Sequence, residues 1–251
     1  MERFKNPPFA ELIIKHSWFM LKLRGVNERP EGVMFKDRRD SGLQLAGRLA
    51  HYKARGRVIV LGLPCGGAVI AFEIARALGA SFDVLIVRKI GFPGQPELAV
   101  GAISETGAVV LNEKVLSYGV SKEYIDDAVR RQKEEIARRI ERYRGGRRLE
   151  DLTSKTVILV DDGVATGATM KAAIAALKED AIERLVAAVP VAPPDTAREL
   201  ASLVDEFVCL STPADFMAVG GYYTDFTQVT DDEVTEILRE SRSLSGALKG
   251  R

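Results

Sequence analysis

The chain lacks the residues from which disulfide frameworks and structural zinc sites are built. Its 251 residues include two cysteines and two histidines, and these are scattered along the sequence: Cys65, Cys209, His16 and His51. So few thiol and imidazole groups predict neither a zinc site nor a disulfide framework. We therefore expect a protein of the reducing cytoplasm.

An excess of charge of one sign and a long apolar run are also missing. The 36 lysines and arginines nearly balance the 35 aspartates and glutamates. Bulk electrostatics therefore predict no nucleic-acid partner. No apolar run approaches the ~20 residues of a membrane span, so no membrane partner is expected either. Glu11, Lys15 and His16 interrupt the apolar stretch near the N-terminus, which argues against a signal peptide.

What the chain has is an alternation of apolar, strand-like runs and helical patterns from about residue 57 onward. We predict strands over 57–63, 82–87, 156–161, 184–190 and 206–210, and helices over 68–79, 168–178 and 195–204. Continuous apolar strands separated by helices indicate an α/β fold, a parallel sheet with helices on both faces. The residues around 104–107 predict an inserted hairpin, and the glycine-rich segment 91–115 predicts a flexible loop.

Two regions fall outside this alternation. We predict an N-terminal extension over 1–33, one domain over 34–240 and a C-terminal tail over 241–251. The domain contains a helical insertion at about 116–155.

Within the insertion, residues 121–144 predict one long helix with Ser121 as its N-cap and Gly145-Gly146 as its stop. Acids precede arginines by four residues in the pairs Asp126–Arg130, Asp127–Arg131, Glu134–Arg138 and Glu135–Arg139. This spacing favours ion pairs within the helix. A solvated, self-neutralised helix is therefore preferred over a nucleic-acid surface.

The segment 156–170, TVILVDDGVATGATM, carries the clearest chemical signal. A predicted strand ends on Asp161 and Asp162, at the edge where open α/β sheets bind ligands. The loop that follows consists of Gly163, Val164, Ala165, Thr166, Gly167, Ala168 and Thr169. Such a loop can bind a phosphate through its backbone N–H groups, its threonine hydroxyls and the N-terminus of the following helix. The two carboxylates can accept hydrogen bonds from the vicinal hydroxyls of a sugar. The pattern therefore predicts a site for a ribose 5-phosphate.

This segment resembles the phosphoribosyl-pyrophosphate (PRPP) motif of the type I phosphoribosyltransferases, which is two acids and a short loop with Thr-Gly after an apolar strand. The resemblance extends over most of 34–240 and implies the parallel-sheet core of that family. It places Asp161 and Asp162 on the ribose hydroxyls and the 163–169 loop on the 5-phosphate. It also implies transfer of ribose 5-phosphate from PRPP to a nitrogen acceptor, foremost a purine-like base. Pyrophosphate would be released, Mg²⁺ would be the cofactor, and the protein would form a homodimer.

A second loop, in LGLPCGGAVIA (61–71), stands where the family has its pyrophosphate loop. By the resemblance, Pro64, Cys65, Gly66 and Gly67 would meet the leaving group. Similar bacterial members carry an arginine where this chain has Cys65. The cysteine is then either a reactive thiol or a small, inert loop residue. The G-x-G-x-x-G spacing of dinucleotide sites is absent, so that alternative is rejected.

The resemblance assigns five further residues. Arg88 and Lys89 would be cations on the leaving group. Glu105, in a segment similar to the catalytic loop of the adenine enzymes, would meet the acceptor base. The alternative for Glu105 is a solvated acid at a hairpin tip. Phe216 and Asp225 lie in a segment similar to that of the hypoxanthine-guanine enzymes, which makes them a base-stacking ring and a magnesium contact. Core packing is the alternative for this aromatic cluster.

Two other functions were weighed against the transferase. A PRPP-sensing regulatory module without catalysis is favoured by Cys65 and by the insertion. A phosphatase-like hydrolase with Asp161 as its nucleophile is disfavoured, because the chain lacks the Asp-x-Asp spacing of such enzymes.

Overall fold

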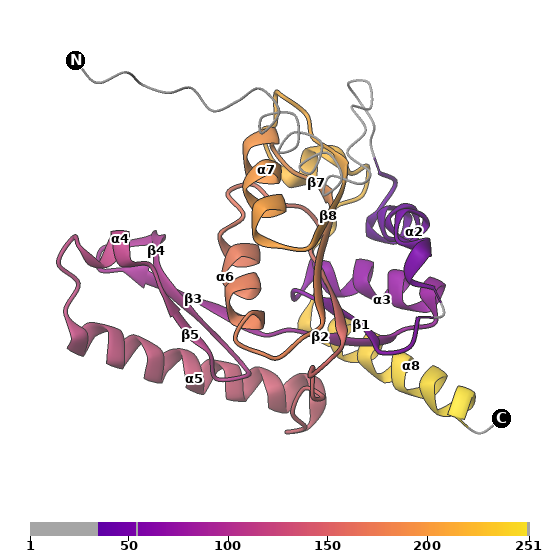
Figure 1. Ribbon diagram of the computed structural model, residues 1–251, viewed down its shortest axis with the longest axis horizontal. Helices are drawn as coiled ribbons and strands as arrows, with labels where there is room; N and C mark the ends of the chain where they lie inside the picture. The colour runs from indigo at the N-terminus through magenta and orange to yellow at the C-terminus, as the bar shows by residue number, and fades with distance from the viewer. Residues whose placement is uncertain (1–34, 54, 250–251) are drawn as a thin grey trace, which may run out of the picture.

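The computed structural model describes residues 35–53 and 55–249. They form a five-stranded parallel sheet with helices on both faces, and a smaller antiparallel sheet on one side of it (Figure 1). The predicted extension over 1–33 lies outside the described residues. Within the described ranges, no helix is long and apolar enough to cross a membrane.

The main sheet has the strand order β2-β1-β6-β7-β8. Its strands are β1 (Val58–Gly62), β2 (Ser81–Val84), β6 (Thr156–Val160), β7 (Arg184–Val191) and β8 (Glu206–Ser211). β1 pairs with β6 up to Gly62 opposite Val160, so these two strands end side by side. The strand order reverses between them, since β2 lies on one side and β7 on the other. The carboxyl ends of β1 and β6 therefore form the switch point of the sheet.

Two helices cover each face of this sheet (Figure 1). These helices are α2 (Arg38–Arg48) and α3 (Gly66–Leu78) on one face, and α6 (Ala168–Leu177) and α7 (Pro194–Leu203) on the other. Successive strand residues point to opposite faces. Val58 and Val60 accordingly pack with α2 and α3, whereas Ile59 and Leu61 pack with α6 and α7. Burial on both faces explains the continuous apolar runs, and the predicted α/β class is confirmed.

The second sheet is built from β3 (Val87–Phe92), β4 (Gln95–Ser104) and β5 (Val109–Leu111). The predicted hairpin is confirmed as β4 and β5, with β3 as a third antiparallel strand. The single strand predicted over 82–87 is wrong. The backbone N–H of Leu85 donates to Gly62 O at 3.0 Å, and the chain then leaves the main sheet for the second one. The apolar run is continuous across this crossing, so its composition shows no break.

The long helix of the insertion is α5 (Lys122–Arg144). Ser121 caps it by accepting the N–H of Tyr124, and Gly145 ends it in the left-handed conformation, as predicted. Of the expected ion pairs, Arg139 binds Glu135 at 3.1 Å, but Arg130 and Arg138 bind the acids three residues before them. The helix is also not solvated all round, because one of its sides packs against the second sheet.

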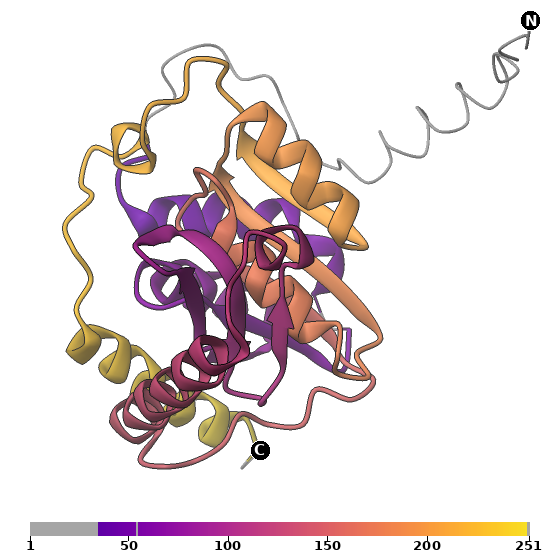
Figure 2. The same ribbon diagram turned by 90° about the vertical axis from the view of Figure 1, so that its left-hand side faces the viewer.

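Helix α8 (Asp231–Lys249) crosses the end of the predicted domain. The boundary predicted at 240 falls inside this helix, and the division into a domain and a tail stays a prediction. α8 lies beside α5, and it also packs against α3 (Figure 2). The remaining short elements are η1 (Ala50–Tyr52), α4 (Glu113–Leu116) and η2 (Val219–Tyr222).

Candidate functional site

The two predicted loops meet at the switch point. Leu63 N donates to Val160 O at 2.9 Å, so the chain after β1 runs along the end of β6. A Cβ on Gly67 would lie 2.6 Å from Val160 O, and a Cβ on Gly66 would overlap the carboxylate of Asp162. The glycines are therefore required because the acid pair packs directly on them. The sequence alone predicts a different reason for these glycines, which is that they allow the backbone to approach the pyrophosphate leaving group.

The loop after the acid pair is fixed from both sides. Val164 N donates to Val191 O at 3.0 Å, and the Thr196 hydroxyl donates to Ala165 O at 2.8 Å. Gly167, at φ 70°, is the N-cap of α6 and offers no side chain to the first turn of the helix. Free N–H groups at the start of a helix favour an anion. The predicted 163–169 loop thus lies at the amino end of α6, immediately after the acid pair.

The two carboxylates have unequal surroundings. Arg38 Nε donates to Asp162 Oδ2 at 2.9 Å, and Asp161 Oδ1 accepts the backbone N–H of Asp162 at 2.9 Å. Burial, followed by the charge of Asp162, raises the pKa of Asp161 well above its usual range. Burial also raises the pKa of Asp162, while Arg38 opposes that rise. Such a pair repels phosphate but can accept hydrogen bonds from the hydroxyl groups of a sugar.

Cys65 lies where the 64–67 loop meets α5 and α8. Its Sγ contacts Asp231 Oδ1 at 3.6 Å, and the same carboxylate accepts the hydroxyl of Tyr143. Burial, followed by the Asp231 charge, raises the pKa of the Cys65 thiol. A thiol that resists ionisation is a poor nucleophile. The environment therefore favours the inert loop residue over the reactive thiol. The peptide bond between Pro64 and Cys65 is cis.

Arg88 and Lys89 do not act as one cationic pair. They are consecutive residues of β3, so their side chains point to opposite faces. Arg88 Nε donates to Gln132 of α5 at 3.0 Å, whereas Val87, on the other face, packs against the core cluster that includes α6. Lys89 shares the face of Val87. The assignment of Arg88 to the leaving group stays a prediction, which its hydrogen bond to the inserted helix does not favour.

Glu105 is a buried structural acid. Its carboxylate accepts the N–H of Ile86 at 2.8 Å and an N–H of Arg144, and its side chain is 2% exposed. Burial raises the pKa of Glu105, and Arg144 opposes that rise. The alternative interpretation of Glu105 as a solvated acid at a hairpin tip is therefore wrong. The assignment of Glu105 to the acceptor base stays a prediction, which the binding of both carboxylate oxygens inside the protein disfavours.

Phe216 and Asp225 lie on the segment after β8. The Phe216 ring stacks on Tyr222, with centroids 5.6 Å apart, and packs against the core cluster of α2 and α3. Asp225 accepts the N–H and the hydroxyl of Thr227 at 2.9 and 2.6 Å, and the hydroxyl bond in particular lowers its pKa.

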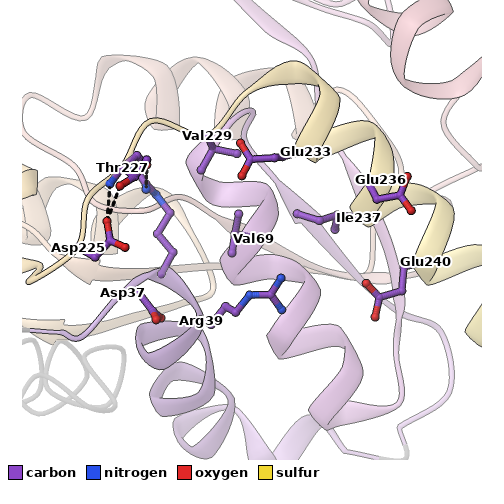
Figure 3. A pocket seen from close by; sticks show the side chains of 11 residues that line it. Asp37, Arg39, Val69, Asp225, Thr227, Val229, Glu233, Glu236, Ile237 and Glu240 are labelled. Carbon is purple, nitrogen blue, oxygen red and sulfur yellow. Dashed lines mark hydrogen bonds between the residues drawn. The ribbon is translucent and has the colours of Figure 1, made fainter.

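Asp225 also lines a pocket of about 340 Å³ between α2, α3 and α8 (Figure 3). Most of the charged groups around this pocket are carboxylates, and Figure 3 shows Glu233, Glu236 and Glu240 on its α8 side. Across the described ranges, no three His, Cys, Asp or Glu side chains are grouped so that they could hold a metal ion. The magnesium contact predicted for Asp225 therefore stays a prediction.

The sequence reading missed residues that reach the site from distant segments. Arg38 binds Asp162 across 124 positions, Tyr223 donates its hydroxyl to Asp162 O at 2.6 Å, and Thr196 holds the loop. None of them belongs to a spaced motif. The segment FKDRRD (35–40) contains two adjacent arginines, Arg38 and Arg39. The sequence does not show which of them is buried against the acid pair.

Comparisons with known proteins identify a family and several relatives that this chain resembles over most of its length. The family model for the phosphoribosyl transferase domain matches residues 43–227. Two Mycobacterium tuberculosis strains each have a protein described as "Putative phosphoribosyl transferase" that is 48% identical over 206 residues, or 82% of this chain. The chain spans about half, 46%, of the length of these relatives. The crystal structure of TT1426 from Thermus thermophilus is 46% identical, has a TM-score of 0.75, and covers 82% of this chain and 98% of its own.

Proposed function

Because the chain belongs to the phosphoribosyl transferase domain family, we propose that it transfers ribose 5-phosphate from PRPP to a nitrogen acceptor with release of pyrophosphate. One observation carries this proposal. The acid pair and the 163–169 loop lie next to each other at the switch point of a parallel sheet, directly against Gly66 and Gly67. A diol acceptor, a phosphate cradle and a close backbone loop thus share one edge of the sheet.

The roles of the residues follow from this placement. Asp161 and Asp162 orient the ribose through its hydroxyls, the 163–169 loop holds the 5-phosphate, and the 64–67 loop lies against the pyrophosphate. The bond between C1 and the pyrophosphate oxygen breaks with its electron pair left on pyrophosphate, a bond from the acceptor nitrogen to C1 forms, and the proton of the acceptor passes to the released pyrophosphate or to solvent. Charge separates in the transition state, so positioning and fixed charges lower the barrier. Lys89 is the proposed cation on the leaving group.

Magnesium fits the site as an ion shared with the substrate. Mg²⁺ is commonly bound by one or two carboxylates together with substrate phosphates, so a cage of three protein acids is not required. Asp225 is exposed and its pKa is lowered, so it is the proposed protein contact. When bound, the ion would offset the negative charge of the pyrophosphate.

We infer a planar nitrogen heterocycle, foremost a purine-like base, as the acceptor. Ala165 brings no charge to the loop, and a Cβ on Gly163 would lie 2.5 Å from Val219 of the segment after β8. The stacked rings of Phe216 and Tyr222 belong to the same segment. This side of the cradle is therefore apolar and aromatic, which suits a flat ring.

A PRPP-sensing module remains the second candidate. Cys65 in the pyrophosphate loop and the engagement of Glu105 by Arg144 favour it, because both remove groups that could assist turnover. The homodimer and the cytoplasmic location stay predictions.

Pyrophosphate release separates the two candidates. The protein is incubated with PRPP, Mg²⁺ and each of a panel of purine and pyrimidine bases, and phosphate is measured after pyrophosphatase treatment. We expect release that depends on at least one purine base. Saturable PRPP binding without release for any base would support the sensor, and absence of PRPP binding would contradict both candidates.

A further inference from the structure

We propose that Arg38 is a positioning residue of this site, which fixes the Asp162 carboxylate for the ribose hydroxyls and ties it to the segment 225–229. The inference rests on the proposed function, because it concerns the same acid pair. Arg38 opens helix α2, far from both segments in the sequence, and its side chain is 10% exposed.

Three contacts hold the guanidinium of Arg38. Nε donates to Asp162 Oδ2 at 2.9 Å, and Nη1 donates to Thr227 O at 2.7 Å. The guanidinium carbon lies 3.9 Å from the centroid of the Phe226 ring, a cation–π contact. The planar group therefore reaches the acid pair on one side and the segment 225–229 on the other. A lysine could not make both hydrogen bonds in this fork geometry.

The Asp162 carboxylate has little room to turn. A Cβ on Gly66 would overlap Asp162 Oδ2 and would lie 2.9 Å from Arg38 Nε. The carboxylate, the guanidinium and the Gly66 backbone thus share one small space. Arg38 and the Gly66 backbone therefore fix the position of Asp162 Oδ2.

The negative charges around Asp161 and Asp162 are offset by the Arg38 guanidinium, which keeps Asp162 ionised to a lower pH. Asp161 is the adjacent carboxylate, the hydroxyl of Tyr223 donates to Asp162 O, and Asp225 and Glu233 lie within electrostatic range of Arg38. Burial raises the pKa of Asp162, and Arg38 lowers it through a hydrogen bond and through its charge. Without Arg38, Asp162 would take up a proton at a higher pH and lose acceptor capacity for a hydroxyl.

Arg38 is not the sole link between α2 and the segment after β8 among the described residues. Thr224 N donates to Phe35 O at 2.8 Å, and Asp225 N donates to Lys36 O at 2.9 Å. Helix α2 has its own N-cap, since Asp37 Oδ1 accepts the N–H of Asp40 at 2.8 Å. Backbone bonds and a cap therefore join α2 to the segment after β8. Loss of the guanidinium is expected to leave the folded chain intact.

The test compares Arg38→Met and Arg38→Lys with Arg39→Met. Arg39 is a matched control, because it lies on the same helix, is 60% exposed and pairs with Glu73 rather than with the acid pair. Each variant is titrated by calorimetry with ribose 5-phosphate and with inorganic phosphate, at about pH 6 and about pH 8, because loss of the Arg38 charge raises the pKa of Asp162 and its effect therefore grows toward lower pH. Thermal melts check that every variant is folded.

We expect Arg38→Met to weaken ribose 5-phosphate about 10- to 100-fold, the value of a hydrogen bond to a charged group, with the larger loss at the lower pH. Inorganic phosphate should bind as it does to the wild type, because the 163–169 loop is unchanged, and Arg39→Met should match the wild type for both ligands. Unchanged ribose 5-phosphate affinity in Arg38→Met would overturn the inference. Equal losses for ribose 5-phosphate and phosphate would also overturn it, since they would indicate a merely structural role.

The experiment also distinguishes misfolding of Arg38→Met from failure of the wild-type chain to bind ribose 5-phosphate. Should Arg38→Met not fold, Arg38→Lys carries the test, with a several-fold loss for ribose 5-phosphate expected and wild-type affinity as the contradicting result. Failure of the wild-type chain to bind ribose 5-phosphate would contradict the proposed function itself. Wild-type binding that is insensitive to Arg38 would contradict this inference alone.

Discussion

Arg144→Met is expected to lower the free energy of unfolding by about 3–5 kcal/mol, because it leaves a buried carboxylate without its cation. Arg144 and Glu105 are 1% and 2% exposed, and they join the last turn of α5 to the hairpin of the second sheet. Arg144 also lies 3.5 Å from Asp83 at the edge of the main sheet. The substitution therefore removes the charge that balances two acids, and urea denaturation measures the loss.

Arg138→Met is the matched control for this prediction. Arg138 lies on the same helix and also pairs with an acid, Glu135, but its side chain is 60% exposed. Exposed ion pairs are worth about 0.2–1 kcal/mol, so a small change is expected. The double variant Arg144→Met with Glu105→Met should recover part of the stability, because neither charge then stays buried alone. Equal effects of Arg144→Met and Arg138→Met would contradict the buried role of the pair.

Gly66→Val is expected to abolish the proposed PRPP binding within the range of calorimetry, a loss of at least about 100-fold if both charge-assisted hydrogen bonds to the diol are lost. A Cβ on Gly66 would occupy the space of Asp162 Oδ2, and it would lie 2.9 Å from Arg38 Nε. The carboxylate cannot move aside without leaving its cation. The valine therefore displaces the acid pair and also thickens the loop that faces the leaving group.

Gly47→Val is the control for this substitution. Gly47 lies in α2, and a Cβ there would meet nothing within 4 Å. Its PRPP affinity should match that of the wild type, and both variants should be folded by circular dichroism. Normal PRPP binding by a folded Gly66→Val variant would show that the acid pair does not hold the ligand.

Elements with strong local signals could be predicted from the sequence. Strand β6, which ends just before Asp161, the loop after it and α6 follow from an apolar run and a change of periodicity. The caps of α5 follow from Ser121 and Gly145. The acid pair and the phosphate loop are adjacent in the chain, so their joint chemistry is visible there. In these segments, hydrophobic periodicity and capping residues were sufficient to predict the structure.

Contacts between distant segments could not be predicted in this way. Arg38 and Asp162 are 124 positions apart, and Arg144 and Glu105 are 39 apart, so no periodicity links them. The burial of Glu105 could not be predicted for the same reason, since a turn sequence does not show that an arginine of another helix packs against it. The crossing between β2 and β3 was missed because both strands draw on one apolar run.

The most direct test of the account is a calorimetric titration of PRPP with Mg²⁺ into the wild-type chain and into the double variant Asp161→Asn with Asp162→Asn. The account predicts saturable binding of one PRPP per chain by the wild type. It predicts a loss of about 3–6 kcal/mol in the double variant, the value of two hydrogen bonds to charged groups. Equal PRPP affinity of the two proteins would contradict the assignment of the acid pair to the ribose.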